Sequence, residues 1–159
     1  MATYHRLSEA QLHQLHFEFA QFLATQGIDK NKWDALKQNE PAKIDPLLDA
    51  FSDVVWEKLF DEARFLEFIT PQKAFLFHAQ THTLKVIVIE NEVPTLDLTK
   101  EEAWKWVLKH WEDPKLTFSS SIKKYAGERN LVLYDYFKKG AVITEGYLYQ
   151  QWESILKIQ

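Results

Sequence analysis

The stretch at residues 64–90 constrains the fold most, because it contains three short runs rich in β-branched and aromatic residues. The runs lie near 64–69, 74–80 and 84–90. A Thr-Pro-Gln-Lys turn signal separates the first two, and a polar Gln-Thr-His-Thr run precedes the third. Parallel strands need a crossover of about a dozen residues or more, so these short spacers predict antiparallel hairpins. We therefore expect a three-stranded antiparallel meander.

Side chains alternate between the two faces of a strand, so the predicted meander can be analysed one face at a time. One face is wholly apolar, whereas the other is apolar at one end and polar at the other. A sheet with one solvated face shows regular polar residues on that side, so we expect a helix or a partner to cover at least half of the second face. The first face carries Phe75, Phe77, Ala79, Leu84, Val86 and Val88, and the second carries Leu76, His78, Gln80, Lys85, Ile87 and Ile89.

The residues before the meander predict a helical block. Ser8 and Gln11 match a capping box, and the apolar residues at 12–23 recur at helical spacing. Asp45 followed by Pro46 is a typical helix start, and it precedes a broad apolar stripe. A stripe this broad predicts a helix that is buried on most of its sides.

Helices are also predicted after the meander. Thr99 and Glu102 match a second capping box, residues 128–139 have helical spacing, and Thr144 is a typical cap for a final helix. The run at 115–121 is a candidate fourth strand. The predicted class is therefore α+β, with a small antiparallel meander between an N-terminal helical block and C-terminal helices.

The composition is that of a globular protein. With 159 residues, 46% hydrophobic and 26% charged, it favours one domain over residues 1–159. No apolar run approaches the roughly 20 residues of a membrane span, so no membrane association is expected. The N-terminal residues do not resemble a signal peptide, which favours the cytoplasm. Cysteine is absent, so disulfides and thiolate chemistry are excluded, and no cofactor motif is present.

Three aromatic residues lie outside the main apolar stripes of their helices: Phe17, Trp56 and Trp106. Aromatic side chains are enriched in the cores of protein interfaces. They favour a soluble, non-enzymatic protein-interaction module, whose partner is a second copy or another protein. The alternative is that these side chains form a second internal layer.

The segment at 119–130 has the composition of an anion-binding loop. It contains three consecutive serines, and Lys123, Lys124 and Arg129 come after them. The segment precedes a predicted helix whose N-terminal amides favour an anion. Arginine binds phosphate through two hydrogen bonds, while lysine supplies a point charge. The alternative to a phosphate-ligand site is a solvated basic loop, with Arg129 paired to Asp135 or Glu128.

Two histidines flank the second predicted turn, His78 and His82. With Glu90 or Glu67 as a carboxylate partner they would suit general acid–base chemistry, as in a small hydrolase or lyase. The alternative is that both imidazoles are solvated turn residues. On balance the sequence favours a protein without enzymatic activity.

Metal and nucleic-acid binding are not expected. His13 and His16 share a helix face, but they lack the glutamate and the spacing of a zincin site. The net charge is −4, and the last predicted helix has Glu145 and Glu153 against one lysine, Lys157. Such a helix offers few donors for phosphates and base edges.

Four segments of the chain resemble an uncharacterised bacterial family of small single-domain proteins, a domain of unknown function. The segments are YHRLSEAQLHQLHFEFAQFLATQGIDKNKWDALK, FSDVVWEKLF, KKYAGERN and KKGAVITEGYLY. The likeness extends over nearly the whole chain. No activity is established for that family, so the resemblance implies a single stand-alone domain and transfers no catalytic, binding or cofactor residue.

Overall fold

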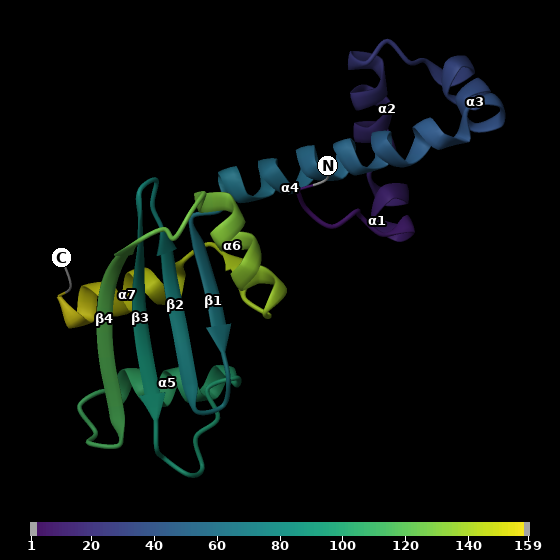
Figure 1. The fold of residues 1–159 in the computed structure, drawn as a ribbon. Helices are drawn as coiled ribbons and strands as arrows, with labels where there is room; N and C mark the ends of the chain where they lie inside the picture. The colour runs from purple at the N-terminus through teal and green to yellow at the C-terminus, as the bar shows by residue number, and fades with distance from the viewer. Residues whose placement is uncertain (1–2, 158–159) are drawn as a thin grey trace. The chain divides into compact units, whose positions relative to one another are not determined.

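The structure, a computed structural model, describes residues 3–157. The chain folds as two compact units, one up to Asp61 and one from Glu62 onward, which we call the helical unit and the sheet unit. The predicted α+β class is confirmed, whereas the single domain expected from length stays a prediction. The elements are α1 (Glu9–Gln14), α2 (His16–Thr25), α3 (Lys30–Asn39), the 3-10 turn η1 (Pro41–Lys43), α4 (Ile44–Glu62), β1 (Phe65–Ile69), β2 (Lys73–Ala79), β3 (Thr83–Asn91), α5 (Glu101–Lys109), β4 (Leu116–Lys124), α6 (Arg129–Lys138), β5 (Val142–Thr144) and α7 (Tyr147–Leu156) (Figure 1).

The sheet unit contains an antiparallel sheet with strand order β4-β3-β2-β1-β5. Both predicted turns form: the Thr70 amide donates to the Lys73 carbonyl at 2.8 Å, and the Gln80 amide donates to the Thr83 carbonyl at 3.0 Å. The candidate fourth strand is present and extends to Lys124. The fifth strand, β5, was not predicted. The meander is therefore the centre of a wider sheet.

The main core lies on the second face of the meander, which the sequence predicted only to be at least half covered. Helices α5 and α7 lie on that side of the sheet in Figure 1. Val107 of α5 and Trp152 of α7 are completely buried there. Burial of large side chains on this face is the main source of stability for the sheet unit. The buried cluster comprises Ala74, Leu76, Ile87, Ile89, Leu98, Val107, Leu116, Tyr149 and Trp152.

The first face of the meander is covered by α6, which lies on the opposite side of the sheet from α5 and α7 (Figure 1). Phe77 is buried and packs against Tyr136 of α6, with ring centroids 4.8 Å apart. Phe68 and Phe75 lie further along this face and are half-buried. The first face is therefore only partly covered, although it is the more apolar of the two in sequence.

The helical unit is held together by aromatic contacts on α4. Phe51 of α4 is buried, and the rings of Phe19 and Phe22 of α2 pack against it at 5.0 and 5.5 Å. Ser8 forms the predicted capping box. The predicted first helix is instead two helices, because the chain leaves helical geometry at Leu15 (φ −103°, ψ 26°).

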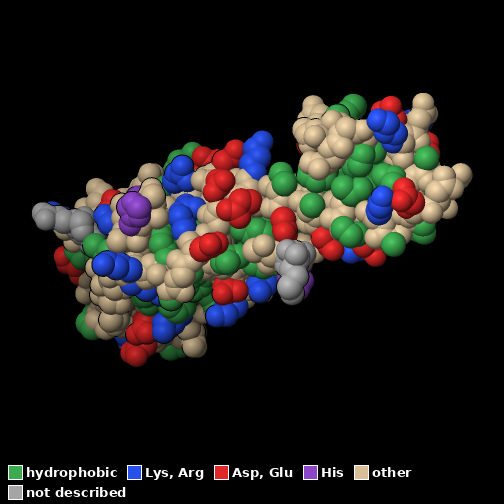
Figure 2. Space-filling view, turned by 45° about the horizontal axis from the view of Figure 1, so that its top comes forward, with side chains coloured by type: hydrophobic (Ala, Val, Ile, Leu, Met, Phe, Trp, Pro, Cys, Tyr) green, Lys and Arg blue, Asp and Glu red, His purple; other side chains and the backbone are tan. Residues whose placement is uncertain are grey.

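The prediction that α4 is buried on most sides is wrong. Only Phe51, Ser52 and Phe60 of this helix are buried, whereas Val54 is 53% exposed and Leu59 is also exposed. Three short helices and an N-terminal segment cannot surround a helix of 19 residues. Figure 2 shows hydrophobic side chains reaching the surface as a group in this unit.

The segment at residues 3–7 runs along α4 as a polar strap. The Thr3 and Tyr4 amides donate to the two carboxylate oxygens of Asp53, each at 2.9 Å. Arg6 donates to Asp49 at 2.7 Å and 3.2 Å, and this bond holds the pKa of Asp49 below its usual value. The strap therefore adds polar contacts along α4, and it also buries the side chains of Tyr4 and Leu7.

Two predicted helix caps are wrong. The Thr99 hydroxyl donates to Asp97 at 2.6 Å instead of capping, so α5 begins one residue later, after Lys100. Thr144 lies in β5, and Gly146 caps α7 with φ +84°. A side chain at that glycine would collide with the ring of Phe65, so both conformation and space require glycine there.

Candidate interaction surface

Strand β4 forms one border of the sheet, and its outer side is the candidate interaction surface. It pairs with β3 in a register that places Ser121 opposite Val86 and Ser119 opposite Val88. The residues from Thr117 to Lys124 are exposed, apart from the half-buried Phe118. Ile122, a β-branched residue suited to sheets, is 55% exposed.

The backbone of β4 presents unpaired groups to solvent at alternate residues. The Glu92 amide donates to the Lys115 carbonyl at 2.9 Å, which fixes the alternation along the ladder. Inward and outward groups alternate in an antiparallel pair, so the odd-numbered residues of β4 bond to β3. The amides and carbonyls of Phe118, Ser120, Ile122 and Lys124 point outward, and we call them the β4 edge. Among the described residues, none of these outward groups has a hydrogen-bond partner.

The two borders of the sheet differ in how they are protected. At the other border, β5 has three residues, and only Glu145 separates it from Gly146, the cap of α7. Natural edge strands avoid pairing by being short, or by carrying charges and proline. By contrast, β4 has nine residues, and Leu116–Ile122 contains neither a charge nor a proline. Only Lys123 and Lys124 protect it, and they lie at one end.

The basic residues of the predicted loop at 119–130 lie in different settings. The three serines, Lys123 and Lys124 belong to β4 instead of a loop. The Lys123 ammonium donates to the Tyr136 hydroxyl at 2.9 Å and lies over that ring. Lys124 is exposed at the end of the strand. The cations therefore belong to a strand and a helix start instead of one loop.

Arg129 contacts backbone carbonyls of the sheet unit. Its guanidinium donates to the carbonyls of Ala63, Ala79 at 3.2 Å and Gln80 at 3.1 Å. The Tyr125 hydroxyl donates to the same Gln80 carbonyl at 2.7 Å, and burial raises the pKa of Tyr125. Within the sheet unit, these contacts join the start of α6 to the residues just before β1 and to the end of β2. The sequence analysis considered a pair between Arg129 and a nearby carboxylate, Asp135 or Glu128. The hydrogen bonds described here go instead to backbone carbonyls that are distant in the chain.

The two histidines proposed for acid–base chemistry occupy unlike environments. His78 lies on the covered face of β2, between the rings of Phe65 at 4.5 Å and Tyr149 at 5.3 Å. Burial lowers the pKa of His78, and its Nδ1 is buried with no hydrogen-bond partner among the described residues. His82 is exposed in the turn that follows β2. One ring is thus packed between aromatic residues while the other faces solvent.

The three aromatic residues proposed for an interface are distributed over both units. Phe17 of α2 is 73% exposed. Trp56 of α4 is half-buried, and its indole donates to the His5 carbonyl at 2.9 Å, which fixes the strap. Trp106 of α5 is half-buried, stacks on His110 at 4.2 Å and lines a cleft of about 400 Å³. Phe17 is therefore the most accessible of the three.

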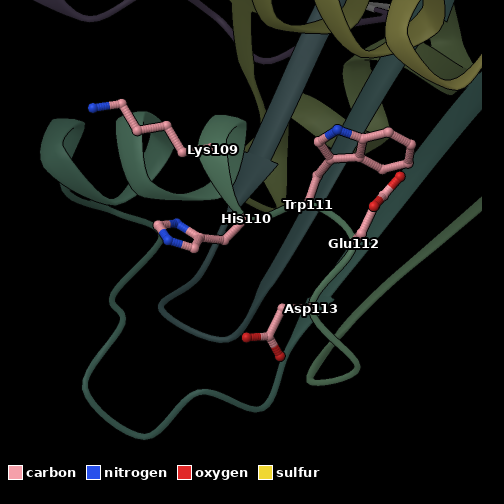
Figure 3. Close-up of a pocket in the computed structure, with 5 residues that line it drawn as sticks. All are labelled: Lys109, His110, Trp111, Glu112 and Asp113. Carbon is pink, nitrogen blue, oxygen red and sulfur yellow. The ribbon is translucent and has the colours of Figure 1, made fainter.

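A further cleft follows the end of α5, with a volume of about 220 Å³. Figure 3 shows that Lys109, His110 and Asp113 point in different directions there, so their polar groups do not converge on a ligand. Within residues 3–157, no group of histidine, aspartate and glutamate side chains is arranged to hold a metal ion. None of the described helices is long and apolar enough to cross a membrane.

The charges on the visible surface are mixed. Figure 2 shows lysine and arginine side chains interspersed with aspartate and glutamate over both units. An electrostatic footprint for a polyanion would be a single basic stripe. The surface charge therefore does not mark a candidate binding site. The β4 edge marks one by its unpaired backbone groups, which are polar but uncharged.

The chain matches the model of a family of unknown function, DUF6495, over residues 1–157. The chain belongs to this family. Comparison with curated proteins and with solved structures gave no match. Membership in DUF6495 confirms the resemblance to a family of unknown function, and it brings no assigned activity, ligand or partner to the residues described above.

The sequence carried a signal for β4 that the prediction used only in part. Leu116, Phe118 and Ile122 occupy alternate positions on one face of the strand, a period of two that is typical of strands. The serines between them resemble a loop. What the sequence could not show is that β4 has one neighbour only, because strand order depends on the whole sheet.

Proposed function

We propose that this member of DUF6495 is a non-enzymatic protein-interaction module that binds an extended segment of a partner at the β4 edge. The observation that carries the proposal is the row of outward backbone groups on a nine-residue strand with one neighbour. In strand addition, main-chain hydrogen bonds supply affinity, and alternate side chains supply specificity. The proposal keeps the cytoplasmic setting and the bacterial source expected from the sequence.

Side chains on β4 support the same proposal. Phe118 packs against Trp152 at 5.1 Å, so a strand added beside it would contact the main core of the sheet unit. Ile122 would gain an apolar neighbour in place of water. The exposed Phe17 offers a second contact point, but it lies in the helical unit.

The alternatives gain less support from the contacts. An anion at Arg129 would have to compete with the carbonyls of Ala79 and Gln80 for the same donors. Acid–base chemistry at His78 would need a donor or acceptor within reach of its buried Nδ1. Protein binding at β4 needs no rearrangement of these groups.

The test compares three baits in a native extract: the wild-type chain, Ser120→Pro and Ser120→Ala. Proline removes the outward amide of Ser120 without breaking a bond to β3, and such a proline is tolerated at a sheet edge. A partner of the β4 edge is expected to bind wild type and Ser120→Ala and to be lost from Ser120→Pro. Partners retained equally by all three baits would contradict the proposal, as would the absence of any partner combined with a chain that does not self-associate.

A further inference from the structure

The nine residues of β4 are complementary to themselves when two copies run antiparallel. With Ser120 placed opposite its own copy, Phe118 lies opposite Ile122, and Ser119 opposite Ser121. The outward-facing residues are all even-numbered, so in this register they face one another across the pair. This register is the one that pairs every residue of the strand.

The charges of β4 select this arrangement over others. In the antiparallel register Lys123 lies opposite Thr117, and Lys124 lies opposite Leu116. In a parallel, in-register pair each lysine would lie opposite the same lysine of the other copy, and like charges directly opposite destabilise a sheet. The two lysines therefore permit antiparallel self-pairing while they disfavour parallel stacking.

The number of available hydrogen bonds matches that of a specific interface. The Leu116 amide already donates to the Asp113 carbonyl at 2.9 Å, so it is not available. The remaining outward amides and carbonyls allow about eight backbone hydrogen bonds between two copies, within the usual range for a protein interface.

Side chains of β4 on the face that α7 covers add apolar contacts to these hydrogen bonds. Ile122 of each copy would lie beside Phe118 of the other, which already packs on Trp152. Helix α7 passes behind β4 in Figure 1, and its C-terminal end extends past that strand. Ile155 and Leu156 near this end are only partly buried. The same face thus has further apolar surface next to the β4 edge.

We infer that the partner at the β4 edge is a second copy of this chain, paired antiparallel about Ser120 to form one sheet continuous through both copies. This inference rests on the proposed function, because it names the segment that the edge binds. Each copy contributes the strand that completes the sheet of the other, so the contact is two-fold symmetric and closed.

The register can be tested with single cysteines, because the chain has none of its own. In the inferred pair, the two Ser120 Cα atoms are about 5.5 Å apart, which suits a disulfide. The two Thr117 positions are six residues out of register, about 20 Å apart along the strands. Ser120→Cys is therefore expected to form covalent dimers under mild oxidation much faster than Thr117→Cys, measured as initial rates at equal concentration.

Assembly is measured by sedimentation across a wide range of concentrations. The wild-type chain is expected to approach twice the 18.8 kDa of one copy. Ile122→Lys places a charge beside Phe118 at two symmetric positions, which is expected to weaken the dimer about tenfold or more. Ser120→Pro is expected to weaken it similarly, while Ser120→Ala remains like wild type. Circular dichroism and amide exchange in β2 establish that each variant is folded.

Two results would overturn the inference. One is a chain that remains a single copy at all concentrations, with equal cross-linking rates for Ser120→Cys and Thr117→Cys. The other is a dimer that persists unchanged in Ile122→Lys and Ser120→Pro. Neither result refutes strand addition as such, because capture of a different protein by wild type and Ser120→Ala, but not by Ser120→Pro, would still support the proposed function.

Discussion

The helical unit and the sheet unit are stabilised in different ways. The sheet unit buries large side chains on both faces of its meander, and Trp152, Leu76 and Ile87 are inaccessible to solvent. The helical unit leaves much of α4 exposed, and polar groups of residues 3–7 bond to its carboxylates instead. The difference shows that the apolar stripe of a helix predicts which of its sides can be buried. It does not show whether the rest of the chain supplies enough residues to bury them.

Removal of a core side chain is the strongest test of this contrast. Trp152→Ala empties the centre of the sheet unit and is expected to lower the free energy of unfolding by about 3–5 kcal/mol. Tyr147→Ala is the matched control, because that side chain is 76% exposed on the same helix, and little change is expected. Urea unfolding, with amide exchange in β2 and β3, measures the loss. Equal effects of the two substitutions would refute the assigned core.

A smaller variant refines the same test. Trp152 Nε1 is buried with no hydrogen-bond partner among the described residues. A buried N–H group without a partner opposes folding, so part of the cost of a smaller ring is recovered when that group is removed. Trp152→Phe is therefore expected to cost clearly less than Trp152→Ala in the same unfolding measurement.

Arg129 tests whether the sheet unit also depends on a polar contact. Arg129→Met keeps much of the side-chain length but removes the donors to Ala63, Ala79 and Gln80. Hydrogen bonds to charged groups contribute roughly 1.5–3 kcal/mol, so a loss of about 2–3 kcal/mol is expected. Lys124→Met is the control, since it removes an exposed cation nearby. If Arg129→Met unfolds like Lys124→Met, these carbonyls are satisfied by other means.

Ser52 tests the polar strap of the helical unit. Its hydroxyl accepts from the Leu7 amide at 3.0 Å and donates to the Leu48 carbonyl at 2.8 Å, and the residue is completely buried. Ser52→Ala leaves the Leu7 amide without that acceptor, so a loss of about 1–2 kcal/mol is expected. Faster amide exchange at residues 4–8 would locate the effect in the strap. Ser154→Ala, an exposed serine of α7, is the control.

The sequence predicted the centre of the sheet well, because short turns fix the register of a hairpin. The two predicted faces agree with the observed pairing of Phe75 with Val88 and of Leu76 with Ile87. The N-terminal capping box was also predicted, since both of its residues lie within one turn of helix. Features governed by neighbours a few residues apart were therefore accessible.

Features that depend on distant or competing neighbours were not accessible. Thr99 could not cap α5 because Asp97 accepts from its hydroxyl and its amide. The partners of Arg129 lie about fifty residues or more away in the chain, so spacing gave no sign of them. The position of β4 at a border follows from strand order, and strand order is a property of the whole sheet.

The smallest expected effect is the pH dependence contributed by His78. Burial between Phe65 and Tyr149 lowers the pKa of His78, while Glu153 acts in the opposite direction and Lys85 and Arg64 act in the same direction. In the unfolded chain, the His78 imidazole binds a proton as the pH falls through the ordinary histidine pKa of about 6.5. In the folded chain, the lowered pKa keeps the same imidazole neutral at that pH. Unfolding stability must then fall as pH is lowered from about 7 through that value, and level off below the folded pKa.

His78→Phe isolates this contribution, because it keeps an aromatic ring beside Phe65 and removes the titrating group. The difference in unfolding free energy between wild type and His78→Phe is expected to change across this pH range, with wild type losing relative stability toward acid. The change is expected to be small, since the ring is only half-buried and solvent screens its charge. His78→Gln, which is polar but does not titrate, should follow His78→Phe in slope. A difference that is independent of pH, or that moves in favour of wild type toward acid, would show that His78 is accessible to protons in the folded sheet unit and that its face is less well covered than the packing of α7 indicates.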